Sequence, residues 1–331
     1  MRIDINLPLF CSMLAIGKRK NRMRKIILIA GHSRSGSTLL DRLLGEMDGF
    51  VTVGELRCLW IRGLHEDQLC GCGTAFKSCG HWRDIVADLP AAETRESWVS
   101  RVLRLQRVVE KSKAIPLLLN PALRPREFSD QLDEYKRELR SLVSGIFEKT
   151  GARVIVDSSK KPTYALIMKE LFGDDVHVVH LVRDSRAVAF SRLRTRLRPE
   201  IHWMEKNMAI GNPLRTGVEW RLANSVLTAM HDAGRCTQLR YEDLVERPRA
   251  TIAGLVADVF AVNPSVVQVP HIYAGAAELS MAHSVAGNPM RFATGRIPIT
   301  LDDEWKKNLS RMRRNVVTLL TRKQLKQYNF I

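Results

Sequence analysis

The segment 31–38, Gly-His-Ser-Arg-Ser-Gly-Ser-Thr, has the composition of a phosphate-binding loop. It follows an apolar run and precedes a helical stretch. In that order backbone N–H groups can close around an anion at the positive end of the helix. Nucleotide triphosphatases carry a lysine after the second glycine, whereas this chain has Ser37 there and places its cation inside the loop as Arg34. This difference argues against a kinase or an ATPase. The simplest alternative is a strand–helix turn that binds nothing.

A second candidate anion site begins at Arg183, directly after the most β-like run of the chain, 176–182. Ser191 follows two helical turns later, so a guanidinium and a hydroxyl could hold one phosphate. Alone this motif is weak, because an ion pair between Arg183 and Asp184 at a strand end explains it equally well.

The elements that must position these residues are short β-rich runs alternating with helical stretches, which predicts an α/β fold. We expect a single domain, residues 25–331, with a P-loop-type parallel β-sheet flanked by helices and an irregular helical, cysteine-containing insertion at 56–127. Strands are expected at 25–30, 50–53, 153–156, 176–182 and 237–240. Helices are expected at 37–47, from Ser129 to about Lys149, after Pro162, after Asp184, at 214–232, after Pro248 and in the basic stretch from Asp302.

Four of the six cysteines, Cys58, Cys70, Cys72 and Cys79, fall in this insertion, close to His81. Three or four sulfurs and a histidine could hold a structural zinc ion, although the C-x-C spacing is tighter than in common zinc fingers. One local disulfide or reduced buried thiols fit the sequence as well. Six cysteines in a chain of 331 residues do not form a dense disulfide framework, so we expect a reducing cytoplasm.

The chain is strongly basic, with 52 Lys and Arg against 35 Asp and Glu and a formal net charge of +17. Such a charge attracts nucleic acid, anionic membranes or small anionic molecules. Part of it belongs to a basic leader, 1–24, which we expect to be poorly ordered or to precede the true start at Met23. Its uncharged stretch, 5–17, is too short to span a bilayer, so no stable membrane insertion is expected. Aromatic residues make up only 6%, which argues against nucleic-acid binding.

Several motifs together resemble the sulfotransferases that use 3′-phosphoadenosine 5′-phosphosulfate (PAPS). They are Arg34-Ser-Gly-Ser-Thr-Leu-Leu40, Val53-Gly-Glu-Leu56, and Arg183 through Ser191, with further likeness at 157–160, 239–244 and 283–292. The resemblance covers most of the chain from residue 25 and is weakest at 56–127. It is closest to the bacterial, carbohydrate and tyrosylprotein branches. The catalytic histidine and loop lysine of the small-phenol enzymes have no counterpart here.

The resemblance implies two binding sites for PAPS as co-substrate. Its 5′-phosphosulfate would be held by Arg34, Ser35, Gly36, Ser37 and Thr38. Its 3′-phosphate would be held by Arg183 and Ser191, with Arg291 or Arg296 contributing, and Tyr241 would lie near the adenosine.

The resemblance also implies an in-line displacement at sulfur. Glu55 would act as the general base, with an ordinary strand-end carboxylate as the alternative reading. Lys160 would donate to the bridging oxygen, with Lys161 as the rival assignment, and Arg34 would stabilise the transferring group. No metal is expected to be required. The acceptor would be a small molecule, carbohydrate or lipid bound beside 56–127 and 199–220. A P-loop kinase-like phosphotransferase and, after it, a basic nucleic-acid-binding protein are the alternatives, and the oligomeric state stays open.

Overall fold

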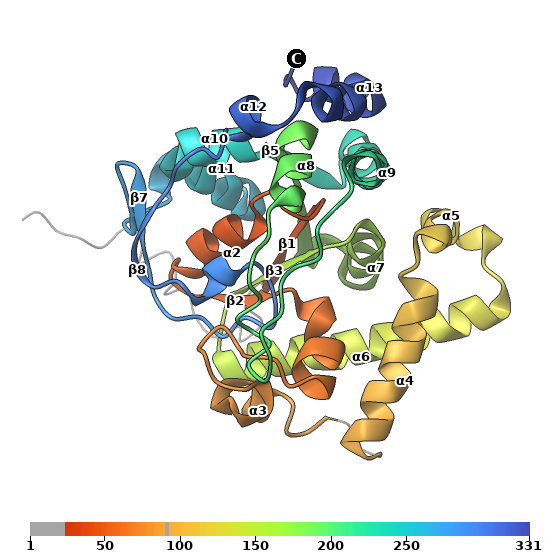
Figure 1. The fold of residues 1–331 in the computed structure, drawn as a ribbon. Helices are drawn as coiled ribbons and strands as arrows, with labels where there is room; N and C mark the ends of the chain where they lie inside the picture. The colour runs from red at the N-terminus through yellow and green to blue at the C-terminus, as the bar shows by residue number, and fades with distance from the viewer. Residues whose placement is uncertain (1–23, 90–92) are drawn as a thin grey trace, which may run out of the picture.

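The computed structural model describes residues 24–89 and 93–331, so the expected basic leader, apart from Arg24, lies outside the described residues. The centre is a sheet of five parallel strands in the order β2-β3-β1-β4-β5, which confirms the predicted α/β class (Figure 1). The strands are β1 (Lys25–Gly31), β2 (Phe50–Gly54), β3 (Val154–Lys160), β4 (Val176–Val182) and β5 (Cys236–Arg240).

Strand β1 is central because its side chains are apolar on both faces. Ile26 and Leu28 pack into one hydrophobic core, and Ile27 and Ile29 pack into another on the opposite face. A strand of this kind must be covered on both sides by helices. The Ile27 side is covered by α2 (Ser37–Gly45), α10 (Tyr241–Glu246) and α11 (Pro248–Phe260). The Ile26 side is covered by α6 (Arg126–Thr150), α7 (Pro162–Phe172) and α9 (Pro213–Asp232).

The insertion 56–127 is more helical than its sequence indicates. It holds a π-helical turn, Leu59–His65, followed by α3 (Gly80–Ile85), α4 (Arg95–Val109) and α5 (Ile115–Leu119). Helix α6 begins at Arg126 rather than at Ser129, directly after Pro125, which has the extended backbone (φ −60°, ψ 149°) of a residue outside the helix. The predicted apolar face of α6 is buried, and Gly151 ends the helix with a φ of 66°. Helix α4 packs against this helix (Figure 1).

Three short strands form a second, antiparallel sheet that the sequence did not predict: β6 (Ile272–Tyr273), β7 (Ala276–Leu279) and β8 (Gly295–Pro298). Runs of two to four residues carry too little alternation to stand out. The loop between β7 and β8 crosses the carboxyl end of the main sheet, since Val285 N–H donates to Val53 O (2.9 Å).

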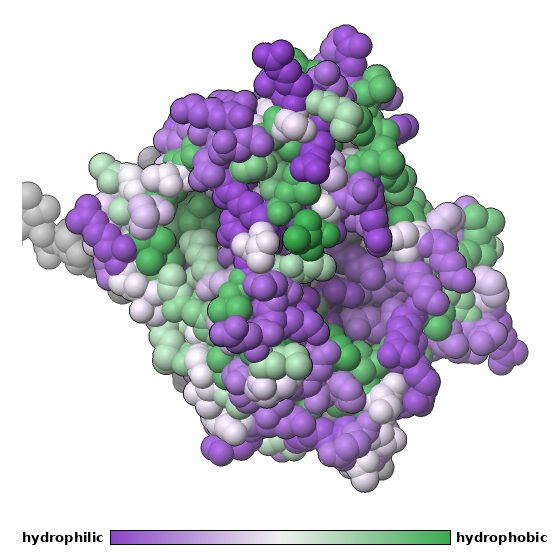
Figure 2. Space-filling model, viewed as in Figure 1, coloured by the Kyte–Doolittle hydropathy of each residue, from purple (hydrophilic) through white to green (hydrophobic). Residues whose placement is uncertain are grey.

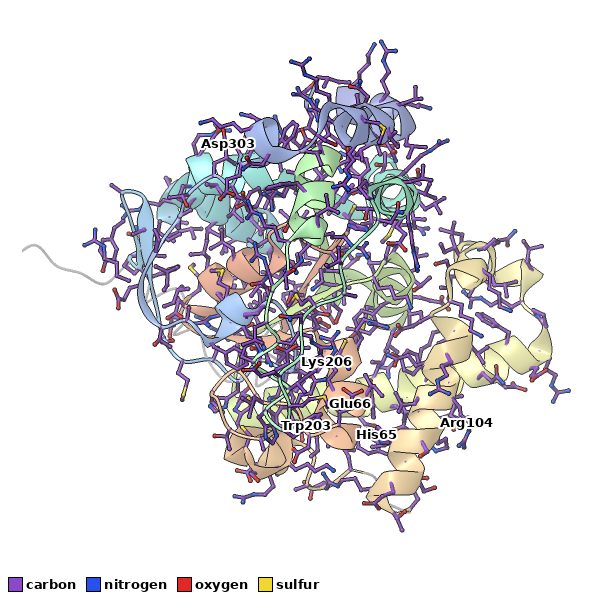
Figure 3. The ribbon with its side chains drawn as sticks, in the orientation of Figure 1. His65, Glu66, Arg104, Trp203, Lys206 and Asp303 are labelled. Carbon is purple, nitrogen blue, oxygen red and sulfur yellow. The ribbon has the colours of Figure 1, made fainter. Side chains whose placement is uncertain are left out.

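A long hairpin, residues 194–212, connects α8 (Ser185–Leu193) to α9 and runs across the front of the sheet (Figure 1). Its arms are joined by Arg198 N–H to Lys206 O (2.8 Å) and Met208 N–H to Arg196 O (2.7 Å). Its tip rests on the insertion, because Leu69 N–H donates to Glu200 O (2.9 Å). In Figure 3 Trp203 and Lys206 of this hairpin lie beside His65 and Glu66 of the insertion, and His202 Nε2 is 3.2 Å from Asp67 O.

The chain ends in α12 (Trp305–Asn308) and α13 (Arg311–Gln327), and the longer helix packs on α8 and α9. Both fall within the predicted basic helical stretch. Among the described residues no helix combines the length and the apolar composition needed to cross a membrane.

Candidate functional site

A cavity of about 630 Å³ lies where β1, β2, β3 and β4 end. Seven cations and three carboxylates line it, an excess of four positive charges. The cations are Arg34, Arg62, Lys160, Arg183, Arg192, Arg196 and Arg198, and the carboxylates are Glu55, Glu200 and Asp302. Burial, followed by repulsion from Arg196 and other arginines, lowers the pKa of Arg34 to about 10. An anionic ligand would relieve this repulsion, because it supplies the missing countercharge.

The loop after β1 has the geometry of an anion cradle. Helix α2 begins after Gly36, whose φ is 91°, and no side chain caps its first turn. The free N–H groups of that turn therefore remain available to an anion. Ser37 and Thr38 line the cavity, whereas Ser35 is buried and does not. Arg34 also lines the cavity and has a φ of 69°, a strained backbone for a residue other than glycine.

Tyr241 joins this loop to the second candidate anion site. A Cβ on Gly36 would meet Cδ2 of the Tyr241 ring at 2.3 Å, so only glycine allows the two to approach this closely. The Arg183 guanidinium lies over the same Tyr241 ring, with its central carbon 4.5 Å from the ring centroid. Arg183 also pairs with Asp302 (3.3 Å), and Ser191 lines the same end of the cavity. The structure therefore brings both predicted anion sites into one cavity.

Glu55 and Lys160 face each other between these sites. Lys160 Nζ donates to Glu55 Oε1 at 2.5 Å, and only 13% of the Glu55 side chain and 15% of the Lys160 side chain are exposed. Burial alone would raise the pKa of Glu55, but the positive charges of Lys160 and Arg62 outweigh it and hold the pKa at about 2. Glu55 is therefore ionised at neutral pH and able to accept a proton.

A buried carboxylate, Asp157, ties the Glu55 and Lys160 segments together. Its Oδ1 accepts from the N–H groups of Leu56 (3.3 Å) and Ser159 (2.9 Å), and its Oδ2 accepts from the Tyr164 hydroxyl (2.9 Å). Burial raises the pKa of Asp157 to about 6, against the hydrogen bonds that it accepts. The residues flanking Glu55 and Lys160 are thus fixed to one carboxylate.

The end of β3 also contains an irregularity that turns Lys160 toward the cavity. Leu28 pairs with Asp157 and Ala30 with Lys160, so β3 uses one more residue than β1 between these pairs. Bulges of this kind re-aim side chains at the ends of strands. Here Lys160 takes a φ of 66° and enters the cavity. The rival Lys161 instead pairs with the buried Glu110 (3.5 Å).

Two predicted donor-binding residues lie away from the cavity. Arg291 is 1% exposed, and its guanidinium donates to the carbonyls of Ser284 (2.5 Å) and Leu69 (2.6 Å). Arg296 is exposed on β8 and does not line the cavity. The loop between β7 and β8 reaches the site through Gly287 and Asn288 instead, with Asn288 N–H donating to Thr38 Oγ1 (3.2 Å).

The structure adds cavity residues that the motifs did not assign. Arg62 comes from the π-helical turn of the insertion, a type of helix often found at functional sites. Arg192 follows Ser191 on α8, and Arg196, Arg198 and Met208 come from the hairpin. The run of arginines after Ser191 is visible in the sequence. Its position at the cavity depends on the hairpin, whose second arm pairs with the first.

Comparison with known proteins identifies a family for this chain. The model of the sulfotransferase family matches residues 27–259. Among solved structures, the chain is similar to the sulfotransferase domain from the curacin biosynthetic pathway (20% identity, TM-score 0.46, covering 91% of this chain and 99% of that one). It is also similar to the sulfotransferase domain from the Synechococcus PCC 7002 olefin synthase (21% identity, TM-score 0.41, covering 92% and 97%). No curated protein matches the chain. Because the family model matches more than half of its length, this chain belongs to the sulfotransferase family.

Proposed function

We propose that this sulfotransferase takes its sulfuryl group from PAPS and transfers it to a hydroxyl or amine of an acceptor. The observation that carries the proposal is the single cavity in which two cationic sites flank the Glu55–Lys160 pair. A 3′-phosphate and a 5′-phosphosulfate together carry about four negative charges. This charge equals the excess of positive side chains that line the cavity.

The chain's residues divide between the two ends of the donor. The amides of the first α2 turn, with Ser37, Thr38 and Arg34, would hold the 5′-phosphosulfate. Arg183 and Ser191 would hold the 3′-phosphate, while the Tyr241 ring would contact the adenosine. When bound, the donor supplies a sulfuryl group attached through a phosphate oxygen.

Glu55 would accept the acceptor proton while the new S–O or S–N bond forms and the S–O bond to the donor phosphate breaks. Lys160 would donate to the oxygen that leaves with the phosphate, and Arg34 would stabilise the sulfuryl oxygens. Once Lys160 is drawn toward the donor, the positive charge that holds down the pKa of Glu55 moves away. Glu55 would then become a stronger base at the moment when the acceptor must lose its proton. These positive groups are all supplied by the chain, and we expect no metal requirement for transfer.

The acceptor would approach from the face shown in Figure 2, which is hollowed on the side toward α4 and α7. Most visible side chains around this hollow are hydrophilic. A polar acceptor such as a carbohydrate, a polar small metabolite or a lipid headgroup fits such walls. A cytoplasmic location remains a prediction from the cysteine content.

The test is to replace Glu55 and Lys160 separately while measuring turnover and donor binding. Glu55→Gln and Lys160→Ala should each lower the rate of sulfate transfer from labelled PAPS by about 10²–10³-fold. Binding of adenosine 3′,5′-bisphosphate, measured by calorimetry, should stay near normal because the anion sites remain. Glu66→Gln and Lys206→Ala serve as matched controls, since both side chains are exposed and lie outside the cavity lining (Figure 3). Near-normal transfer by both site variants would contradict the assignment.

A further inference from the structure

Three sulfurs and one imidazole meet outside the PAPS cavity. Cys70, Cys72 and Cys79 come from the insertion, and His283 comes from the loop between β7 and β8. One ligand atom from each lies within 4.8 Å of every other. From the sequence, Cys58 and His81 were further candidate ligands. In the structure Cys58 contacts Glu55 instead, and the histidine of the cluster is His283, not His81.

The distances within this cluster fit a tetrahedral metal site. Sγ of Cys72 and Sγ of Cys79 are 3.8 Å apart, and His283 Nδ1 lies 3.8 Å from Sγ of Cys70 and 3.3 Å from Sγ of Cys79. A tetrahedral zinc ion with thiolate and imidazole ligands requires S–S edges of about 3.8 Å and S–N edges of about 3.6 Å. Cys70, Cys72 and Cys79 are free thiols in the structure.

The backbone around the cluster has the form of a ligand-bearing knuckle. Cys70 N–H donates to Thr74 O (2.8 Å), and Gly73 makes the turn with a φ of 83°. Gly73 N–H donates to Cys70 O (2.9 Å), which closes the turn that carries Cys70 and Cys72.

The histidine is oriented from both sides. Trp82 Nε1 donates to the His283 carbonyl (2.9 Å), and the His81 ring stacks on the His283 ring at 4.4 Å with 7° between the planes. These contacts fix the backbone and the ring plane of His283.

A buried cation provides an independent reason to expect negative charge here. Arg291 is 1% exposed and forms no ion pair within 4.0 Å among residues 24–89 and 93–331, while Glu200, Cys70 and Glu55 act on it from a greater distance. Its two N–H contacts go to the carbonyls of Leu69 and Ser284, the neighbours of Cys70 and His283. An unpaired buried charge is costly. Zinc bound by three thiolates and a neutral imidazole carries a net charge of −1 and would compensate Arg291.

We propose that Cys70, Cys72, Cys79 and His283 bind one structural Zn²⁺ ion that joins the insertion to the loop between β7 and β8. Binding releases the three thiol protons to solvent and involves no change of oxidation state. The four ligands leave no open position, as in structural rather than catalytic zinc sites. The proposal does not depend on the identity of the sulfuryl donor.

The zinc site would stabilise the loop between β7 and β8, which forms part of the wall of the donor cavity. Gly71 N–H donates to Ser284 O (2.9 Å), and Glu55 N–H donates to Ala286 O (3.3 Å) on the same loop. Two residues further on, Asn288 reaches the phosphate-binding loop at Thr38. Loss of the ion is therefore expected to loosen the loop that covers the first anion site, as well as to lower stability.

The first experiment measures metal content in the full chain purified without a histidine tag. Elemental analysis after equilibration with Zn²⁺ and gel filtration should give one zinc per chain. Cys72→Ser and His283→Gln should lose it, whereas the matched controls Cys236→Ser and His65→Gln should keep it, because Cys236 lies on β5 and His65 is exposed and outside the cluster. Zinc well below one equivalent in the wild-type chain, or equal content in all five proteins, would overturn the proposal.

A second measurement works on folded wild-type protein, so it stays informative if the variants fail to fold. Titration with a mercurial thiol reagent should release zinc in step with the modification of three thiols, followed with a colorimetric zinc indicator. Replacement by Co²⁺ should give the intense visible bands of a tetrahedral site with thiolate-to-cobalt charge transfer. Octahedral cobalt spectra, or an oxidised cysteine pair in the intact mass under non-reducing conditions, would contradict the assignment. Adenosine 3′,5′-bisphosphate binding, measured in parallel, separates failure of this site from failure of the proposed donor.

Discussion

Arg34 and Lys160 both adopt left-handed backbone conformations, with φ values of 69° and 66°. Such conformations cost free energy in residues other than glycine and are concentrated at functional sites. Both side chains enter the cavity from the ends of neighbouring strands. Sequence motifs indicated that these residues matter, but they could not show the strain, because it depends on the neighbouring strands and on the bulge in β3.

Gly36 offers a sharp test at the level of one residue. Gly36→Ala should weaken binding of adenosine 3′,5′-bisphosphate and destabilise the fold by about 1–3 kcal/mol, because the new Cβ would collide with the Tyr241 ring. Gly254→Ala in α11 is the matched control, since a Cβ there has no neighbour within 4 Å. Calorimetry and urea unfolding measure the two effects. Equal behaviour of the two variants would show that the Gly36–Tyr241 contact does not matter.

Glu55 should make stability depend on pH in an identifiable window. Its pKa of about 2 in the folded chain lies below the ordinary value of 4.5, so between these pH values the unfolded chain binds more protons. The stabilisation from ionised Glu55 is therefore present above about pH 4.5 and is lost as the pH falls toward 2. Urea unfolding of the wild type and of Glu55→Gln should show a difference in stability that narrows over this range. A difference that widens toward acid pH would have the wrong sign.

At the scale of elements, the sequence located the parallel strands and most helices because long apolar runs and periodic faces are visible in it. It did not reveal the small antiparallel sheet or the hairpin, whose positions depend on contacts with distant segments. The family resemblance assigned Arg291 or Arg296 to the donor, because Arg291 lies in the segment 283–292 and Arg296 comes shortly after it. The structure turns the Arg291 side chain inward to Leu69 and Ser284.

The link between β2 and β3 through Asp157 can be tested by removing its carboxylate. Asp157→Ala should lower kcat by about 10- to 100-fold, because Leu56 and Ser159 lose their acceptor and the neighbouring Glu55 and Lys160 shift. The dissociation constant of adenosine 3′,5′-bisphosphate should change little, and Asp157→Asn should restore much of kcat, since its amide oxygen can accept the same N–H bonds. An equal loss in both variants, or a loss of donor binding, would argue against a positioning role.

At the scale of the whole molecule, the structure shows where part of the net charge of +17 lies. Part of it, an excess of four positive side chains, lines one cavity suited to a small anion, whereas DNA binding requires a basic patch or stripe along a surface. The composition could not distinguish these cases, since it contains no information on where side chains point.

The rise in melting temperature caused by different ligands distinguishes the three candidate functions: sulfotransferase, kinase-like phosphotransferase and nucleic-acid-binding protein. Adenosine 3′,5′-bisphosphate should raise Tm in buffer that contains no added metal, because a ligand selective for the folded chain stabilises it. The shift should shrink as salt screens the cavity charges. A larger shift with ATP and Mg²⁺ would favour a kinase-like phosphotransferase, and a larger shift with an oligonucleotide would favour nucleic-acid binding.

The contact between Arg34 and the hairpin bears on the order in which substrates bind. Arg34 Nη2 lies 2.7 Å from Met208 Sδ, a weak acceptor that a sulfate oxygen would readily replace. Arrival of the donor would therefore detach the hairpin arm from Arg34 and change the shape of the wall that lies over the cavity. An acceptor site formed partly by that wall would be complete only after the donor is in place. The donor would then be favoured to bind before the acceptor.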